Sequence, residues 1–276
     1  MRIEDLPAAA TPCVGESIYS WLEATRVQLG VGAPEWRQWC GFSREEPERR
    51  TSGEGWGDLP TELGQIERIP ASWRIAAEWR GIGCSECAVA TSRNPRYPVL
   101  VDWLDARTIA CAQHRLLLSY QPAEDAMPVD SNAELLAMWR WLEQWRLESL
   151  ARQDAKLRRD LVLASGRNWG PGFGAIASAE LAWVIEGSGW RLPKPQRQYR
   201  PLGPARIGSL SPIDRAASLL GAYRAWMALS DPSTQSLPAW PTPAWDWLAR
   251  RWCRGGDERL GAMLTGVAVA SRGGRR

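Results

Sequence analysis

The chain has 276 residues, 45% of them hydrophobic and 24% charged, so it is long enough to bury one sizeable core or two small ones. This composition excludes a disordered chain and a disulfide-dense miniprotein. No run of eighteen apolar residues is present, and the N-terminus lacks the charged start and apolar stretch of a signal peptide. We therefore expect a cytoplasmic protein without a membrane segment.

Charge is distributed unevenly along the chain. Residues 1–155 contain 16 basic and 23 acidic side chains, whereas residues 156–276 contain 18 basic and 8 acidic ones. The net charge therefore changes from −7 to +10 between these parts. A basic half favours contact with a polyanion, although a solvated basic surface explains the same count.

The first predicted element is an amphipathic helix over residues 15–30, because apolar residues recur at three- and four-residue spacing until Gly30. Residues 31–70 predict short helices around a loop. Another short helix is expected between Trp73 and Trp79.

The following segment has a different character. Residues 83–122 are short on helical periodicity, rich in turn residues, and contain a β-favouring run from Tyr97 to Trp103. Ser131 and Glu134 then have the spacing of a capping box, which predicts a long helix that continues past Leu161.

The basic half begins with a glycine-rich stretch that predicts a turn, followed by a helix over residues 176–186. Residues 191–210 hold four prolines and no acidic side chain, so they predict an extended, exposed linker.

Two further helices carry clear start signals. Ser211 and Thr242 are each followed by proline, which favours the first helical position, and we expect helices to about Leu229 and Cys253. The C-terminal tail SRGGRR is expected to be disordered.

Two ligand pairs predict a structural zinc site. Cys84 and Cys87 form a C-x-x-C pair, and Cys111 and His114 form a C-x-x-H pair whose histidine is the single one in the sequence. Four such donors complete the tetrahedral shell of zinc and leave no position for water, so the expected ion is structural rather than catalytic. The other cysteines, Cys13, Cys40 and Cys253, are expected to pack as small hydrophobic residues.

These elements predict a mainly α protein: a helical N-terminal region, a small α+β zinc-ribbon-like module, and a basic α-helical C-terminal region. The expected divisions are the N-terminal helical part (1–82), the zinc module (83–122), a long helix and helical region (123–190), the linker (191–210), and the basic helical region with its tail (211–276).

The sequence argues against an enzyme. With His114 used as a ligand, no second imidazole is left for a nucleophile–histidine pair or a histidine-bound catalytic metal. The glycine-rich stretch 166–174 lacks the lysine and hydroxyl of a phosphate-binding loop.

Two separated motifs, in order, resemble the TniQ family. The first is Gly15-Glu16-Ser17-Ile18-Tyr19-Ser20-Trp21-Leu22, preceded by Leu6-Pro7. The second is the Cys-x-x-Cys pair, then Tyr97 and Trp103, then Cys111-x-x-His114 followed by Leu117-Leu118. The resemblance covers about residues 6–120, and Ser119 to Pro122 offer no second ligand pair of the kind many members carry, so one zinc ion is expected.

The resemblance implies a non-catalytic target-selection protein of DNA transposition. Such a protein links a target, either DNA or a CRISPR effector complex with its guide RNA, to a transposon AAA+ ATPase. Glu16, Ser17 and Trp21 would then serve the fold or the partner surface. The basic half would approach the nucleic acid backbone, with these candidate contacts: Arg191, Lys194, Arg197, Arg200 and Arg206.

Alternatives remain from the sequence alone. One is a zinc-containing DNA-binding regulator, although about twenty residues separate the helices at 176–186 and 211–229, far more than a helix-turn-helix allows. Another is a protein–protein scaffold that does not touch nucleic acid, and an enzyme of unrecognised type is a third. The sequence is also compatible with a homodimer.

Overall fold

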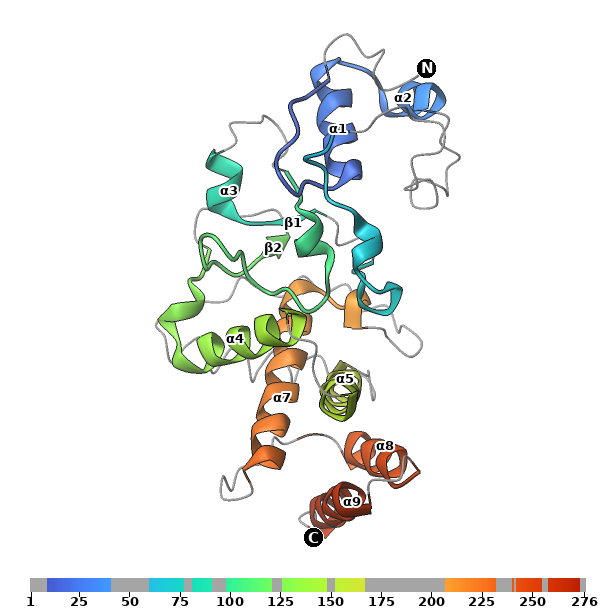
Figure 1. Ribbon diagram of the computed structural model, residues 1–276, viewed down its shortest axis with the longest axis vertical. Helices are drawn as coiled ribbons and strands as arrows, with labels where there is room; N and C mark the ends of the chain where they lie inside the picture. Colours follow the sequence, from blue (N-terminus) through green and yellow to red (C-terminus); the bar gives the residue numbers. More distant parts are fainter. Residues whose placement is uncertain are drawn as a thin grey trace. The chain divides into compact units, whose positions relative to one another are not determined.

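The computed structural model describes residues 9–40, 60–76, 81–90, 98–120, 126–147, 152–166, 207–231, 240, 242–254 and 258–273. The chain forms two compact units, Met1–Pro128 and Val129–Arg276. The elements are mainly helical, with one pair of two-residue strands in the described part, so the expected mainly α class is confirmed (Figure 1). Within the described residues, no helix is both long and apolar enough to cross a membrane.

The first unit opens with helix α1 (Ile18–Gln28), whose N-terminus is capped by the Ser17 side chain. At its C-terminus Gly30 adopts a φ of +67°, and its N–H bonds to the carbonyl of Val27. The N–H of Val31 bonds to the carbonyl of Arg26, which completes a Schellman motif. The prediction that Gly30 ends this helix is therefore confirmed.

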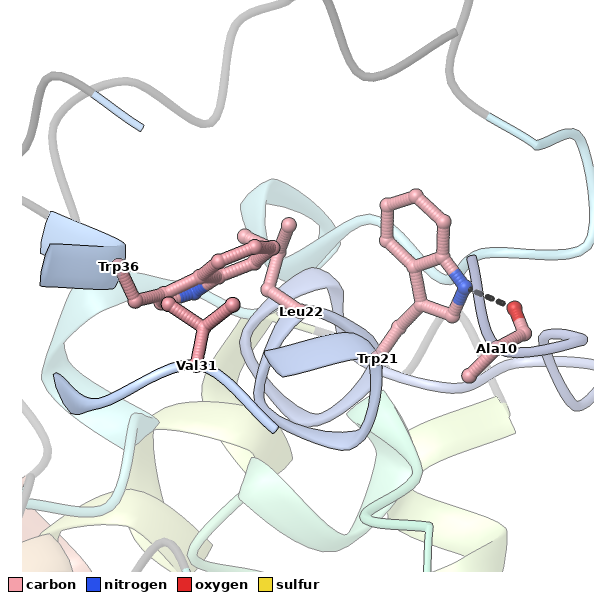
Figure 2. Close-up of a cluster of buried hydrophobic side chains, with 5 residues drawn as sticks. All are labelled: Ala10, Trp21, Leu22, Val31 and Trp36. Carbon is pink, nitrogen blue, oxygen red and sulfur yellow. Dashed lines mark hydrogen bonds between the residues drawn. The ribbon is translucent and has the colours of Figure 1, made fainter. Parts of the chain in front are cut away.

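Helix α2 (Ala33–Cys40) follows directly and packs with α1 around a small apolar cluster. Figure 2 shows the cluster, with the Trp21 indole on one side and Trp36 on the other. Its buried members are Ala10, Trp21, Leu22, Val31 and Trp36.

The rest of the first unit consists of short elements joined by backbone hydrogen bonds. Their bounds are η2 (Ile66–Arg68), η3 (Ala71–Trp73), β1 (Ile82–Gly83), α3 (Ser85–Ala90), η5 (Val101–Leu104) and β2 (Ser119–Tyr120). The end of η3 is bound to the end of η5, because Ile75 N–H donates to the Leu104 carbonyl and Ala106 N–H donates to the Trp73 carbonyl.

The second unit is a set of packed helices. They are η6 (Val129–Ser131), α4 (Ala133–Leu147), α5 (Arg152–Gly166), η7 (Ile207–Ser209), α7 (Pro212–Ser230), α8 (Thr242–Cys253) and α9 (Glu258–Gly273). Helix α7 packs against α4 and α5, and α8 packs against α5 and α9. Leu161, Leu219, Trp245 and Leu248 are among the buried residues of this unit.

Aromatic and charged side chains join α4, α5 and α7. Trp141 lies 5.7 Å from Tyr223 and 6.2 Å from Trp226, measured between ring centroids. The Arg158 guanidinium lies 4.5 Å from the Trp226 centroid. On α7, the Arg224 Nε lies 2.6 Å from the Glu134 carboxylate of α4.

Several predictions of local structure are corrected. The helix expected between Trp73 and Trp79 is wrong over residues 74–76, which are not helical, and Arg74 is extended and bridges to Asp105; residues 77–80 lie outside the described part. In the described part of the β-favouring run, residues 101–103 lie in a 3₁₀ turn and Leu100 forms an isolated bridge, whereas Tyr97 lies outside the described residues.

The start and length of the expected long helix are also corrected. Its cap is Asn132 rather than Ser131, because the Asn132 side chain accepts from the N–H groups of Glu134 and Leu135. The helix ends at Leu147, and α5 is a separate element.

Some predictions for the second half of the chain are confirmed and others are wrong. The starts and ends expected for α7 and α8 are confirmed. However, Ile207 is buried in a 3₁₀ turn instead of lying in an exposed linker, and α9 includes Ser271 to Gly273 of the tail expected to be disordered. The helix expected at 176–186 lies outside the described residues.

Candidate metal centre

The first ligand pair lies where a strand turns into a helix. Strand β1 ends immediately before Cys84, and α3 begins immediately after it. The Cys84 carbonyl accepts a hydrogen bond from the N–H of Ala88, which winds the chain into a helical turn and places Cys87 one turn further on. Cys84 is buried and Cys87 is partly exposed.

The second ligand pair lies on a tight hairpin turn. The N–H of Cys111 donates to the Leu116 carbonyl, and the N–H of Arg115 donates back to the Cys111 carbonyl. Arg115 closes the turn with a φ of +55°, in the left-handed region. The hairpin therefore holds Cys111 and His114 on one side of a short, closed loop.

Strand pairing brings the two ligand pairs together. Strand β1, which leads into Cys84, pairs antiparallel with β2, which follows the hairpin, with Ile82 opposite Tyr120 and Gly83 opposite Ser119. The hairpin is further held by the hydrogen bond from Leu118 N–H to the Ile109 carbonyl. Ligands about thirty residues apart in sequence thus meet across a two-stranded ladder.

The ligand atoms of all four residues lie within 4.8 Å of one another. The His114 Nδ1 is 3.4 Å from the Cys84 Sγ, 3.3 Å from the Cys87 Sγ and 3.7 Å from the Cys111 Sγ. The Cys87 and Cys111 sulfur atoms are 3.8 Å apart. The predicted ligands therefore form one compact cluster that could hold a metal ion.

The three thiols of the cluster differ in pKa because their surroundings differ. A hydrogen bond from the Cys84 thiol, helped by the backbone N–H groups of His114 and Gln113, lowers the pKa of Cys111 to about 5 against the effect of burial. Burial, followed by the charge on Cys111, raises the pKa of Cys87 to about 11. The pKa of Cys84 is also raised, first because its thiol donates to Cys111 and second by burial. Without a metal, the cluster thus favours one thiolate and two thiols.

The motif around Glu16 lies in the same unit, and its polar atoms face inward. The two Glu16 carboxylate oxygens accept from the Cys13 N–H and from the Ser20 hydroxyl, each at 2.9 Å. The Ser17 hydroxyl caps α1 by accepting from the Ser20 N–H. The Ser20 hydroxyl in turn accepts from the N–H of Val99.

This motif is bound to the chain that runs between the two ligand pairs. The N–H of Ser17 donates to the Val99 carbonyl, and the N–H of Val101 donates to the Gly15 carbonyl, both at 2.8 Å. Gly15 has a φ of +76°, which favours glycine. The start of α1 and the metal cluster are therefore parts of one hydrogen-bonded framework.

Trp21, on α1, completes the motif. Its indole N–H donates to the Ala10 carbonyl at 2.6 Å, and the side chain is 1% exposed (Figure 2). Glu16 and Ser17 are buried as well. Burial gives all three side chains a role in the fold of this unit.

The predicted nucleic acid contacts lie outside the described residues: Arg191, Lys194, Arg197, Arg200 and Arg206. In comparisons with known proteins, no family model, no curated protein and no solved structure matches the chain.

Proposed function

We propose that this protein is a non-catalytic adaptor of DNA transposition, whose first unit is organised by one structural zinc ion and recruits a transposon AAA+ ATPase to a target. The observation that carries the proposal is the joining of two motifs in one framework. The Gly15-to-Leu22 motif and the cysteine–histidine cluster resemble one family, and backbone hydrogen bonds connect them through Val99 and Val101.

The identity of the ion is supported by the donor set and its spacing. With metal–sulfur bonds of about 2.3 Å and a metal–nitrogen bond of about 2.0 Å, a tetrahedral zinc site has sulfur–sulfur edges of about 3.8 Å and sulfur–nitrogen edges of about 3.5 Å. The cluster has a sulfur–sulfur distance of 3.8 Å and sulfur–nitrogen distances of 3.3 to 3.7 Å. Thiolate and imidazole donors also suit zinc better than magnesium or calcium.

The same donor set supports a structural role for the ion. Three sulfur atoms and one nitrogen fill four tetrahedral positions, so no position is left for a substrate or an activated water. The module departs from a zinc ribbon in its first half, because Cys84 and Cys87 flank the start of α3 instead of lying on a second hairpin. We regard it as zinc-ribbon-like through the hairpin that carries Cys111 and His114 and through the β1–β2 pair.

An adaptor of this kind acts by holding partners together, so its test is partner capture. The purified protein is mixed with transposon AAA+ ATPases, and complex formation is measured by pull-down with ATP present. We expect Cys84→Ser to lose ATPase capture, because one ligand of the cluster is removed. The matched control is Cys253→Ser, which changes an exposed cysteine outside the cluster and is expected to leave capture unchanged.

Other outcomes would contradict the proposal. If the wild-type chain bound no ATPase but bound duplex DNA tightly, a DNA-binding regulator would replace the adaptor. If it bound protein partners with no loss at raised salt and never bound nucleic acid, a scaffold would be the better description.

A further inference from the structure

Helix α8 carries a cluster of arginines around a hollow of about 300 Å³, here called the α8 hollow. Its lining side chains in the described part of the chain are Trp247, Arg250, Arg251 and Arg254. These positions are three, four and seven residues after the tryptophan, so they form a stripe along one side of the helix. The opposite side of α8 is buried through Trp245, Leu248 and Trp252.

Arg251 is held in place by two contacts. Its Nε lies 2.8 Å from an oxygen of Asp160 on α5, whose carboxylate is fully buried. Its guanidinium also lies 5.5 Å from the centroid of the Trp247 ring. A side chain restrained in this way loses less conformational entropy when it binds a ligand.

Arg250 and Arg254 supply charge that the ion pair does not neutralise. Both are exposed, and neither has an acidic partner among the described residues. Of the three arginines that line the hollow, only Arg251 is paired with the Asp160 carboxylate among the described residues, so the hollow keeps an excess positive charge.

The positive surface extends onto the neighbouring helix. Helix α5 packs against α8 and carries Lys156, whose Nζ lies 4.9 Å from the Trp252 ring, and the half-exposed Arg159, 3.7 Å from Asp160. The other acidic residues on these two helices are Asp154 and Asp246. Basic residues thus outnumber acidic ones on these two helices.

The shape of the hollow restricts what it can bind. Small-molecule sites are walled by several elements and bury most of the ligand, whereas the described lining of this hollow comes from α8 and from Arg254 directly after it. Arg250 and Arg254 are about 6 Å apart along the helix axis, so they can reach separate anionic groups of an extended ligand. The planar fork of arginine also matches a phosphate group.

We infer that the α8 hollow binds the sugar–phosphate backbone of duplex DNA. Duplex DNA offers one negative charge about every 1.7 Å of helix axis, which suits a row of arginine side chains spaced along a helix. The inference deepens the proposed function, because it assigns the nucleic acid contact to named side chains; the choice of duplex DNA over other polyanions rests on that function.

The test measures binding of a short labelled duplex by fluorescence anisotropy at several salt concentrations. The variant is Arg250→Ala with Arg254→Ala, which leaves the Arg251–Asp160 pair intact. The matched control is Arg68→Ala with Arg140→Ala, which removes two exposed arginines elsewhere. We expect the first variant to lose roughly tenfold to sixtyfold in affinity at about 0.1 M salt and to reduce the salt slope by about two.

The control should lose less than about threefold, since neither arginine lines the hollow. A second variant, Arg250→Lys with Arg254→Lys, should keep most of the affinity because it keeps both charges. Circular dichroism establishes that each variant is folded. The inference is overturned by equal losses in variant and control, by absence of wild-type binding at low salt, or by tighter arginine-dependent binding of RNA.

Failure of the DNA-binding inference can be distinguished from failure of the proposed adaptor role. Zinc content and ATPase capture are measured on the same double variants and are expected to stay at the wild-type level. A variant that lost DNA binding and kept ATPase capture would support both proposals. A wild-type protein that captured the ATPase but bound no DNA would overturn this inference alone.

Discussion

The hydroxyl of Ser20 lies 2.9 Å from the backbone nitrogen of Val99, a residue 79 positions later in the chain. Ser20 also donates to Glu16, so one hydroxyl connects helix α1 with the segment that precedes η5. Removing the hydroxyl removes the hydrogen bond that it accepts from the Val99 N–H and the one that it donates to the buried Glu16 carboxylate. We expect Ser20→Ala to lower the free energy of unfolding by roughly 2 kcal/mol, from the cost of unpaired buried polar groups.

Urea unfolding followed by circular dichroism measures this change. Ser72→Ala is the control, because Ser72 is exposed in η3 and its substitution should change stability by less than about 0.5 kcal/mol. Equal stability of the two variants would show that the Ser20 contact contributes nothing measurable.

Metal removal should affect the two units differently. All four ligands lie in the first unit, and structural zinc contributes on the order of 10 kcal/mol to the folding of small modules. We expect one zinc per chain by elemental analysis, and loss of hydrogen-exchange protection around Cys84 and Cys111 after chelation. The helices α5 and α7 should keep their protection, since they belong to the second unit. A chelated protein with unchanged exchange throughout would contradict a structural ion.

Metal loading should release protons from the thiols. The pKa of Cys87 is raised to about 11 and that of Cys84 is raised as well, so both are protonated in the metal-free protein at neutral pH, whereas Cys111, with its pKa lowered to about 5, is ionised. Coordination requires thiolates, so about two protons should leave near pH 7.5. Because protons compete with the metal, affinity should fall as pH falls, by about 100-fold per unit in this range.

Calorimetric titration in two buffers of different ionisation enthalpy counts these protons. If no protons were released, the metal-free cluster would already hold three thiolates. The same titration on Cys253→Ser should give the wild-type proton count, because that residue lies outside the cluster.

The turn at Arg115 should tolerate glycine better than a β-branched residue. Its φ of +55° is uncommon for a residue with a side chain, and glycine adopts this region without steric cost. We expect Arg115→Gly to keep or slightly raise the melting temperature of the metal-bound protein. Arg115→Val should destabilise it by about 1 to 2 kcal/mol. Thermal unfolding of both variants with zinc present distinguishes these effects; equal destabilisation would mean that the Arg115 side chain itself holds the turn.

The metal cluster could be predicted from the sequence because its information is local. Each ligand pair has its own three-residue spacing, and a single histidine leaves little ambiguity about the fourth ligand. Helices α7 and α8 were predictable for a similar reason, since Ser211 and Thr242 each precede a proline at the start.

Other features depend on partners distant in sequence. Arg74 and Ile75 are not helical because they pair with Asp105 and Leu104, which no local pattern reveals. Asn132 caps α4 in place of Ser131, and Glu134 binds Arg224 instead of folding back onto the cap. The stripe from Trp247 to Arg254 was not predicted, because its hollow and its contact with the buried Asp160 depend on how α5 packs against α8.

The inward direction of the Glu16 motif has a consequence for recognition. Its polar atoms form hydrogen bonds within the protein itself. The motif can therefore indicate the fold of this unit without indicating which partner the unit binds. Val14 lies beside the motif and Tyr19 lies within it. Both side chains are exposed and can vary without disturbing those hydrogen bonds. Proteins that share the motif can therefore diverge in their partners while keeping the same scaffold.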